Sequence, residues 1–213
     1  NLVRTHGIAI DTERDVMVLT DVGEASSATD GAVVIITDFT EAIEDNMVSA
    51  DEQVRIEGDN TLLGNPVDVA YDYLNQEIYV AERANAGGRI LVYDAMTDGG
   101  DVAPTYNREF AGASAIYYSD YMEDGFELET IKQFFTSSNT EQFVNIYSIK
   151  EDSSIEREFF ESQGTDADGI YYDDQLDKLY ELDRTNNMIN VYGDVESGMY
   201  TFLYSSSSDF ING

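Results

Sequence analysis

The feature that most constrains the fold is a pattern of apolar residues that the chain repeats. In three short segments, a run of small or apolar residues closes on an aspartate. These segments are 7–11, 68–72 and 169–173, and a weaker fourth copy at 115–119 closes on a serine. The closing positions 11, 72, 119 and 173 are separated by 61, 47 and 54 residues. Spacings of this size are typical of repeats that each form a four-stranded antiparallel sheet.

The similarity continues beyond the first segment of each repeat. A second apolar stretch follows at one fixed offset, at 17–19, 78–80 and 179–181. Third strands are predicted at 31–37, 88–94, 143–147 and 188–192, and more polar fourth strands at 53–57, 105–110, 155–160 and 201–205. The turns before the third strands contain Gly or Asn, which tolerate the positive φ of tight hairpins. We therefore predict one all-β domain over 1–213, with four repeats at about 5–58, 65–110, 113–160 and 166–206.

Little of the chain is predicted to be helical. The segments 41–46 and 128–133 could each form a turn or two of helix, and the second would belong to an insertion in the third repeat.

Four sequential antiparallel sheets indicate blades around an axis, with the first strand of each blade nearest the centre. The segments 66–72, 76–82 and 88–94, and the same outline over 168–194, resemble the NHL-type and gluconolactonase-like β-propellers. This resemblance implies a β-propeller of four-stranded blades. Such propellers usually have more than four blades, so we expect a segment of a ring of about six to eight blades. A closed four-bladed ring is the alternative.

The charge and composition exclude several functional classes. The 11 Lys and Arg against 43 Asp and Glu give a net charge of −32, which repels nucleic acid. The absence of Cys excludes disulfides and thiolate metal sites, and a single His excludes multi-His metal centres. No apolar run is long enough to span a membrane. The acidity favours an extracellular or periplasmic protein, although no leader sequence is present in the chain.

The acids that recur in the repeats are predicted to be structural. Asp11, Asp72 and Asp173 would each fix a turn by accepting backbone amides. Ten residues after each of these stands another acid, at Asp21, Glu82 and Asp183, and we expect the same role there. Arg83 and Arg184 directly follow two of these acids and are predicted to form salt bridges with them.

Ligand-binding candidates are placed where the chain enters each inner strand. These equivalent positions are His6, Val67, Ser114 and Asp168. The resemblance implies that Asp68 and Asp168 could supply oxygen ligands to calcium, and His6 could act as a base or a ligand. Capping of strand ends is the simpler role for all of them. We assign no catalytic residue.

Two tyrosines complete the set of binding candidates at the channel mouth, which comprises His6, Ser114, Tyr117 and Tyr171. Tyr117 and Tyr171 occupy equivalent positions and could form an aromatic platform for a sugar, although packing between blades is the alternative.

The regular repeat without a convergent catalytic constellation favours a non-enzymatic extracellular or periplasmic binding module. Its partner would be a protein, a peptide or a glycan, and further blades could come from sequence outside this chain. The alternatives are a calcium-dependent lactonase-like hydrolase with its site at the central channel, and a structural component of a larger surface assembly.

Overall fold

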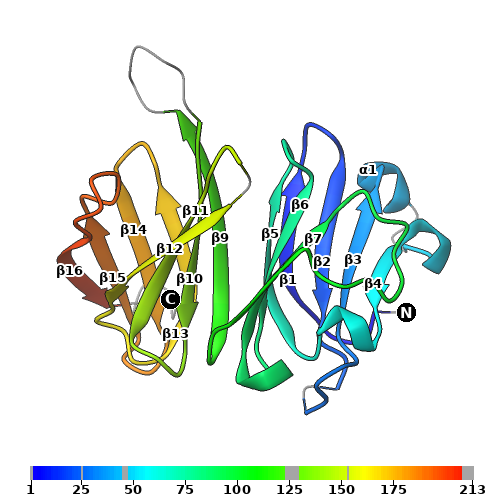
Figure 1. The fold of residues 1–213 in the computed structure, drawn as a ribbon, viewed down its shortest axis with the longest axis horizontal. Helices are drawn as coiled ribbons and strands as arrows, with labels where there is room; N and C mark the ends of the chain where they lie inside the picture. Colours follow the sequence, from blue (N-terminus) through cyan, green and yellow to red (C-terminus); the bar gives the residue numbers. More distant parts are fainter. Residues whose placement is uncertain (1, 25, 45–47, 123–129, 153, 208–213) are drawn as a thin grey trace. The chain divides into compact units, whose positions relative to one another are not determined.

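A computed structural model describes residues 2–24, 26–44, 48–122, 130–152 and 154–207, with the backbone alone at 120–122 and 130–131. The chain divides into two compact units, Asn1–Ala113 (unit 1) and Ser114–Gly213 (unit 2). Within the described residues, each unit is built mainly from two antiparallel sheets, and the strands of each sheet follow one another in sequence order (Figure 1).

Unit 1 holds the first two sheets. The first contains β1 (Thr5–Asp11), β2 (Val16–Asp21), β3 (Ala32–Thr37) and β4 (Val54–Glu57). The second contains β5 (Pro66–Asp72), β6 (Glu77–Glu82), β7 (Arg89–Asp94) and β8 (Tyr106–Glu109). Short helical segments lie in the connections, at α1 (Phe39–Ala42), η1 (Ala50–Glu52), η2 (Asp59–Thr61) and η3 (Asn85–Gly87).

Unit 2 holds the other two sheets. The third contains β9 (Ala113–Met122), which begins at the last residue of unit 1, β10 (Thr130–Ser138), β11 (Phe143–Ile149) and β12 (Ile155–Glu161). The fourth contains β13 (Ala167–Asp173), β14 (Lys178–Asp183), β15 (Met188–Gly193) and β16 (Thr201–Ser207). The predicted all-β class, with four antiparallel four-stranded sheets, is thereby confirmed over the described part of the chain.

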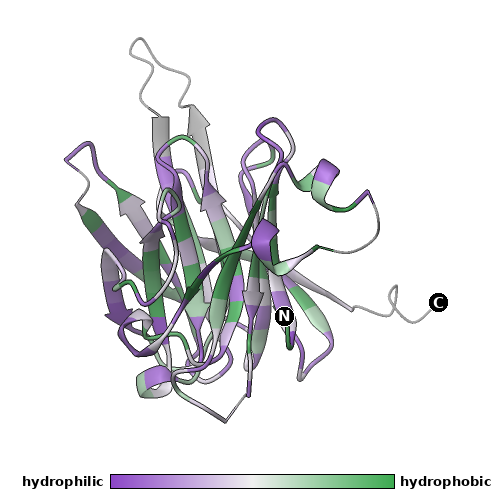
Figure 2. Cartoon of the chain, turned by 90° about the vertical axis from the view of Figure 1, so that its right-hand side faces the viewer, coloured by the Kyte–Doolittle hydropathy of each residue, from purple (hydrophilic) through white to green (hydrophobic). Residues whose placement is uncertain are grey.

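The apolar alternation of the strands buries one face of each sheet against its neighbour within the unit. Figure 2 shows hydrophobic residues concentrated in the strands and hydrophilic residues in the connecting loops. The core of unit 1 includes Val18, Val33, Val69, Val80 and Leu91. The core of unit 2 includes Phe135, Val144, Ile146, Tyr172, Leu179 and Tyr192. In each unit both sheets contribute residues to the core. Alternate residues of a strand point to opposite faces of its sheet, so one set of side chains faces the neighbouring sheet.

The helix predictions need one correction. Helix α1 overlaps the start of the predicted 41–46 segment, whose end lies outside the described residues, and it covers apolar side chains of the first sheet with Phe39 and Ala42. The predicted helix at 128–133 is wrong where it is described, because β10 begins at Thr130. Pairing of Lys132 with Ile149 and burial of Phe134 and Phe135 favour the strand.

The recurring aspartates hold the turns that follow three of the inner strands. Asp11, Asp72 and Asp173 each accept hydrogen bonds from the backbone amides two and three residues ahead, at 2.9–3.1 Å. A side chain that satisfies two amides of the turn favours the turn over extended backbone. The predicted structural role of these three carboxylates is confirmed.

Candidate functional site

The opposite ends of the inner strands are anchored by the second set of recurring acids. Asp21, Glu82 and Asp183 are 2%, 0% and 1% exposed. Each accepts hydrogen bonds from backbone amides 17 or 18 residues earlier, where the chain enters β1, β5 or β13. The segments that enter these three inner strands are therefore fixed from within.

The electrostatics of two of these acids differ. Burial raises the pKa of Glu82 and outweighs the opposing effect of amide donors that include Asn65 and Asn85. At Asp21 burial acts in the same direction, but hydrogen bonds from the amides of Arg4 and Val3 and from Arg55 outweigh it and lower the pKa. The Arg55 guanidinium lies 3.2 Å from Asp21 Oδ2.

The inner strands are irregular where they begin. The register shifts between Thr5 and Ile8 in β1, between Pro66 and Asp68 in β5, and between Ala167 and Gly169 in β13. The entrance positions His6, Val67 and Asp168 lie within these shifts. Extra residues of this kind turn side chains out of the regular alternation and are common beside functional sites.

His6 presents an imidazole at the irregular start of β1. The ring is exposed, and Nδ1 lies 2.6 Å from the carbonyl oxygen of Val67. Because a carbonyl oxygen only accepts, Nδ1 must donate, so in the neutral ring the lone pair is on Nε2. The bond therefore orients the imidazole and leaves its basic nitrogen directed away from the Val67 carbonyl.

The backbone at Asp68 lies against the start of β1, because β1 and β5 approach very closely. A Cβ added to Gly7 would stand 2.6 Å from Asp68 Cα, so only glycine permits this contact between the two backbones. Asp68 is half-buried, and its Oδ1 accepts a hydrogen bond from the amide of Val69 at 3.0 Å. Unit 1 thus brings an imidazole and a carboxylate to the same end of adjacent inner strands.

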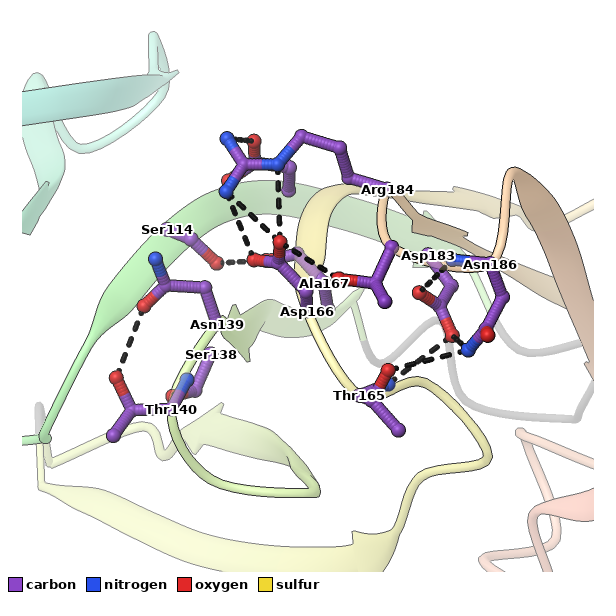
Figure 3. A network of polar contacts seen from close by, with 12 residues as sticks. Ser114, Ser138, Asn139, Thr140, Thr165, Asp166, Ala167, Asp183, Arg184 and Asn186 are labelled. Carbon is purple, nitrogen blue, oxygen red and sulfur yellow. Dashed lines mark hydrogen bonds and ion pairs between the residues drawn. The ribbon is translucent and has the colours of Figure 1, made fainter.

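In unit 2 the equivalent end carries a charged triad of Asp166, Asp168 and Arg184, of which Figure 3 labels Asp166 and Arg184. Asp168 Oδ2 lies 2.7 Å from Arg184 Nη1, and Asp166 Oδ2 lies 2.9 Å from Arg184 Nη2. The hydrogen bonds that Arg184 donates to Asp166, together with the negative charges of Asp168 and Asp166, raise the pKa of Arg184. The predicted pairing of Arg184 with Asp183 is wrong, because Asp183 turns inward to the amide of Thr165. Asp166 was not among the predicted site residues.

Ser114 lies inside unit 2 and is only 4% exposed. Its hydroxyl donates a hydrogen bond to the carbonyl oxygen of Ala167, which links β9 to β13 (Figure 3). This bond parallels the one from His6 to Val67, because equivalent positions of successive sheets are joined in both units. The role of Ser114 in ligand binding stays a prediction.

Tyr117 and Tyr171 are brought together as edge-to-face rings with centroids 5.0 Å apart. Tyr171 is 51% exposed, whereas Tyr117 packs against the core of unit 2. Tyr180 extends the group, with its ring centroid 6.2 Å from that of Tyr171. The exposed ring of Tyr171 is suited to stacking, although the sugar platform itself stays a prediction.

The carboxylates do not form a convincing metal cage. Among the described residues, no group of three or more His, Cys, Asp or Glu side chains is placed to hold a metal ion. Asp168 is already paired with Arg184, whereas calcium takes six to eight oxygen ligands. The arrangement therefore does not fit the calcium site predicted at Asp68 and Asp168, and no chemistry is derived through a metal here.

Comparison with known proteins gives matches in structure only. No protein-family model and no curated protein sequence matches the chain. A periplasmic gluconolactonase from Pseudomonas aeruginosa is 13% identical, with a TM-score of 0.65, over 96% of this chain and 54% of that one. A candidate 6-phosphogluconolactonase from Bacteroides uniformis is 11% identical, with a TM-score of 0.60, over 96% of this chain and 57% of that one.

A third solved structure, the Swd1 β-propeller domain of Myceliophteria thermophila, is 14% identical with a TM-score of 0.59, over 97% of this chain and 57% of that one. The chain has a β-propeller fold. It spans a little over half the length of each of these solved proteins. The predicted fold class is confirmed, and the similar structures are consistent with the suspected resemblance to gluconolactonase-like propellers.

The names of these structures correct the preferred function. The sequence favoured a non-enzymatic binding module, but solved proteins that share the fold are named as a gluconolactonase and as candidate 6-phosphogluconolactonases. They favour the lactonase-like alternative. The described residues include no helix long and apolar enough to cross a membrane.

Proposed function

We propose that the chain is a lactonase-like hydrolase that opens sugar lactones, with His6 as its general base. The observation that carries this proposal is the hydrogen bond from His6 Nδ1 to the Val67 carbonyl, which leaves Nε2 free to accept a proton. Histidine is the side chain most often used for such proton transfer near neutral pH. The fold shared with proteins named as lactonases supports the choice of substrate class.

The reaction needs one activated water molecule. Nε2 takes a proton from the water as its oxygen attacks the lactone carbonyl carbon, and a tetrahedral intermediate forms. The bond between the carbonyl carbon and the ring oxygen then breaks, and the imidazolium returns the proton to the departing ring oxygen. The product is the open-chain hydroxy acid. Asp68, at the same end of the neighbouring inner strand, accepts hydrogen bonds from substrate hydroxyls.

The direct test is the initial rate of D-glucono-1,5-lactone hydrolysis by the purified chain, after subtraction of the rate without protein. We expect His6→Gln to lower kcat by roughly 100-fold or more, which is the usual contribution of a general base. Thr5→Ala is the matched control, because Thr5 is the exposed neighbour of His6 in β1. A folded wild-type chain with no excess rate, or an unchanged rate in His6→Gln, rejects the proposal.

Calcium binding at Asp68 and Asp168 stays a prediction from the sequence, which the ion pair between Asp168 and Arg184 disfavours. Calorimetric titration of the chain with calcium chloride tests it. Saturable heat that is lost in Asp168→Asn supports a site there, and the absence of heat rejects it. An extracellular or periplasmic location is likewise proposed, and the acidity of the chain and the periplasmic gluconolactonase among the similar structures support it.

A further inference from the structure

Unit 1 contains a pocket at the end of β1 far from His6. Its volume is about 260 Å³, and it is lined by residues 9–14, which comprise the end of β1 and the following turn, and by Tyr71 and Tyr73 near the end of β5. His6 lies five residues before Asp11, so the pocket is roughly 17 Å away along the strand, at about 3.3 Å per residue. The pocket is therefore distinct from the proposed catalytic end.

Arg14 is held in a fixed position at this pocket. Its Nη1 lies 3.1 Å from Asp11 Oδ2, and its guanidinium carbon lies 4.4 Å from the centroid of the Tyr73 ring. Burial acts to raise the pKa of Asp11, but hydrogen bonds from Arg14 and Glu13 outweigh it and lower the pKa. An ionised carboxylate and an aromatic ring thus orient the guanidinium, which has five donors in one plane.

The turn itself does not require an arginine. The equivalent position is Asn75 after β5 and Leu176 after β13, and both turns are closed by their aspartates through the same two amide bonds. Asn75 also clamps its aspartate with a side-chain bond of 2.5 Å, while Leu176 has no polar side chain. The extended guanidinium of Arg14, lying over Tyr73, therefore exceeds what the turn needs and points to a ligand.

The charges and the size of the pocket define the ligand. Asp11 and Glu13 outnumber Arg14, and the chain as a whole carries −32, so anions are repelled. The volume is below the range of about 300–1,000 Å³ for drug-sized ligands, which leaves room for one ring. Aromatic walls with a few planar polar groups suit a ring that has one apolar face and hydroxyls at its edge.

We propose that this pocket binds a neutral monosaccharide, with Arg14 donating to adjacent hydroxyls, Glu13 accepting from them, and the two tyrosines packing against the ring. Burial and the charge of Asp11 raise the pKa of Tyr71, so its hydroxyl stays protonated and can donate as well. The proposal is independent of lactone hydrolysis, because none of these residues belongs to the entrance end.

The test is calorimetric or NMR titration of the full chain with D-glucose, D-galactose and D-mannose, and with sodium gluconate as the anionic counterpart. We expect at least one neutral sugar to bind with a dissociation constant of about 1 mM, a free energy of about −4 kcal/mol. Gluconate should bind at least tenfold more weakly. Arg14→Lys keeps the charge beside Asp11 but loses the planar fork, and should weaken sugar binding by about tenfold.

Glu13→Ala should weaken binding of the same sugar. Gln175→Ala, at the equivalent position in the turn after β13, is the matched control and should leave the affinity unchanged. Three results overturn the proposal. They are no binding of any neutral sugar at a concentration 20-fold above the expected dissociation constant, tighter binding of gluconate than of any neutral sugar, or unchanged affinity in Arg14→Lys. His6→Gln should leave sugar binding intact, so failure of this site and failure of lactone hydrolysis are separately observable.

Discussion

Single buried carboxylates determine how the inner strands begin. Asp21 and Glu82 occupy equivalent positions and make equivalent amide bonds, yet their pKa values shift in opposite directions. Asp21 also receives a charged donor, the Arg55 guanidinium. The donors to Glu82 include the backbone amides of Gly64, Asn65, Ala84 and Asn85. We therefore expect the contribution of this acid to stability to depend on pH in opposite ways in the two sheets of unit 1.

Asp21→Asn should lower the free energy of unfolding by about 1.5–3 kcal/mol at pH 7, the range for hydrogen bonds to a charged group. Folding lowers the pKa of Asp21, so its stabilisation is present above the ordinary value of 3.8 and is lost as the pH falls through the folded-state pKa. Urea unfolding from pH 7 to pH 3 measures this, and the difference from wild type should shrink toward the acidic end.

The control for this prediction is Asp98→Asn, at an exposed position in the connection that follows β7. It should leave stability within about 0.5 kcal/mol, as surface substitutions usually do. A deficit in Asp21→Asn that stays constant from pH 7 to pH 3 would show that the carboxylate charge is not what stabilises the entrance to β1.

Repetition made some residues predictable and hid others. The aspartates at 11, 72 and 173 were assigned correctly because a turn requires the same acceptor wherever it recurs. The partner of Arg184 was predicted wrongly. Arg184 pairs with Asp168, which lies within the register shift between Ala167 and Gly169, and sequence spacing alone does not reveal that shift. Asp166 could have been found from its place two residues before Asp168, with an arginine on the neighbouring strand end.

Glu181 shows a further limit of reading repeats as equivalent. It was placed within an apolar stretch, at the position that holds Val80 in the second sheet, but it is a fully buried carboxylate. Ser162, Asn190 and Tyr192 donate to it at 2.6–3.1 Å. A Cβ on Gly164 would come within 2.9 Å of the Glu181 carboxylate. An acid at this position therefore needs a glycine opposite it and hydrogen-bond donors from other strands.

At the scale of elements, the four-sheet organisation was predictable because each sheet needs its own set of alternating strands and turns. The strand β10 was missed, since its sequence does not repeat the pattern of β2, β6 and β14. Its conformation is decided by pairing with β11, a contact between residues such as Phe134 and Tyr147, whose rings stack at 4.5 Å. Local sequence does not contain that partner.

The contact between β1 and β5 gives a prediction at this scale. Gly7→Ala should destabilise the chain by about 2–3 kcal/mol, because the new Cβ would overlap backbone atoms of Asp68 and Val69 that cannot move aside. Gly169→Ala is the matched control at the equivalent position of β13, where a Cβ would meet Leu182 at an ordinary 3.4 Å. Chemical denaturation of both variants measures the difference, and equal losses would contradict the close approach.

At the scale of the whole molecule, the excess of acids dominates. A net charge of −32 over 213 residues repels itself in the folded state. Raising sodium chloride from 0.1 to 1 M shortens the Debye length from about 10 to 3 Å, so the repulsion is screened. We expect Tm to rise by at least about 3 °C, which corresponds to roughly 1 kcal/mol for a chain of this size. Calorimetry measures it.

Chloride is the right salt for this experiment, because sulfate also strengthens apolar burial and would raise Tm by a different route. A Tm that is unchanged or lower at 1 M sodium chloride would show that repulsion among the acidic side chains does not destabilise the folded state. The same result would weaken the link between the acidic composition and an extracellular or periplasmic location.

The proposed chemistry depends on which nitrogen of His6 carries the proton. Because the chain has a single histidine, the ¹⁵N spectrum of its imidazole can be assigned without ambiguity. The most direct measurement is that spectrum, recorded at a pH where the ring is neutral. The hydrogen bond to Val67 predicts a protonated Nδ1 and an unprotonated Nε2. A ring that is protonated mainly on Nε2 would contradict the assignment of His6 as the general base.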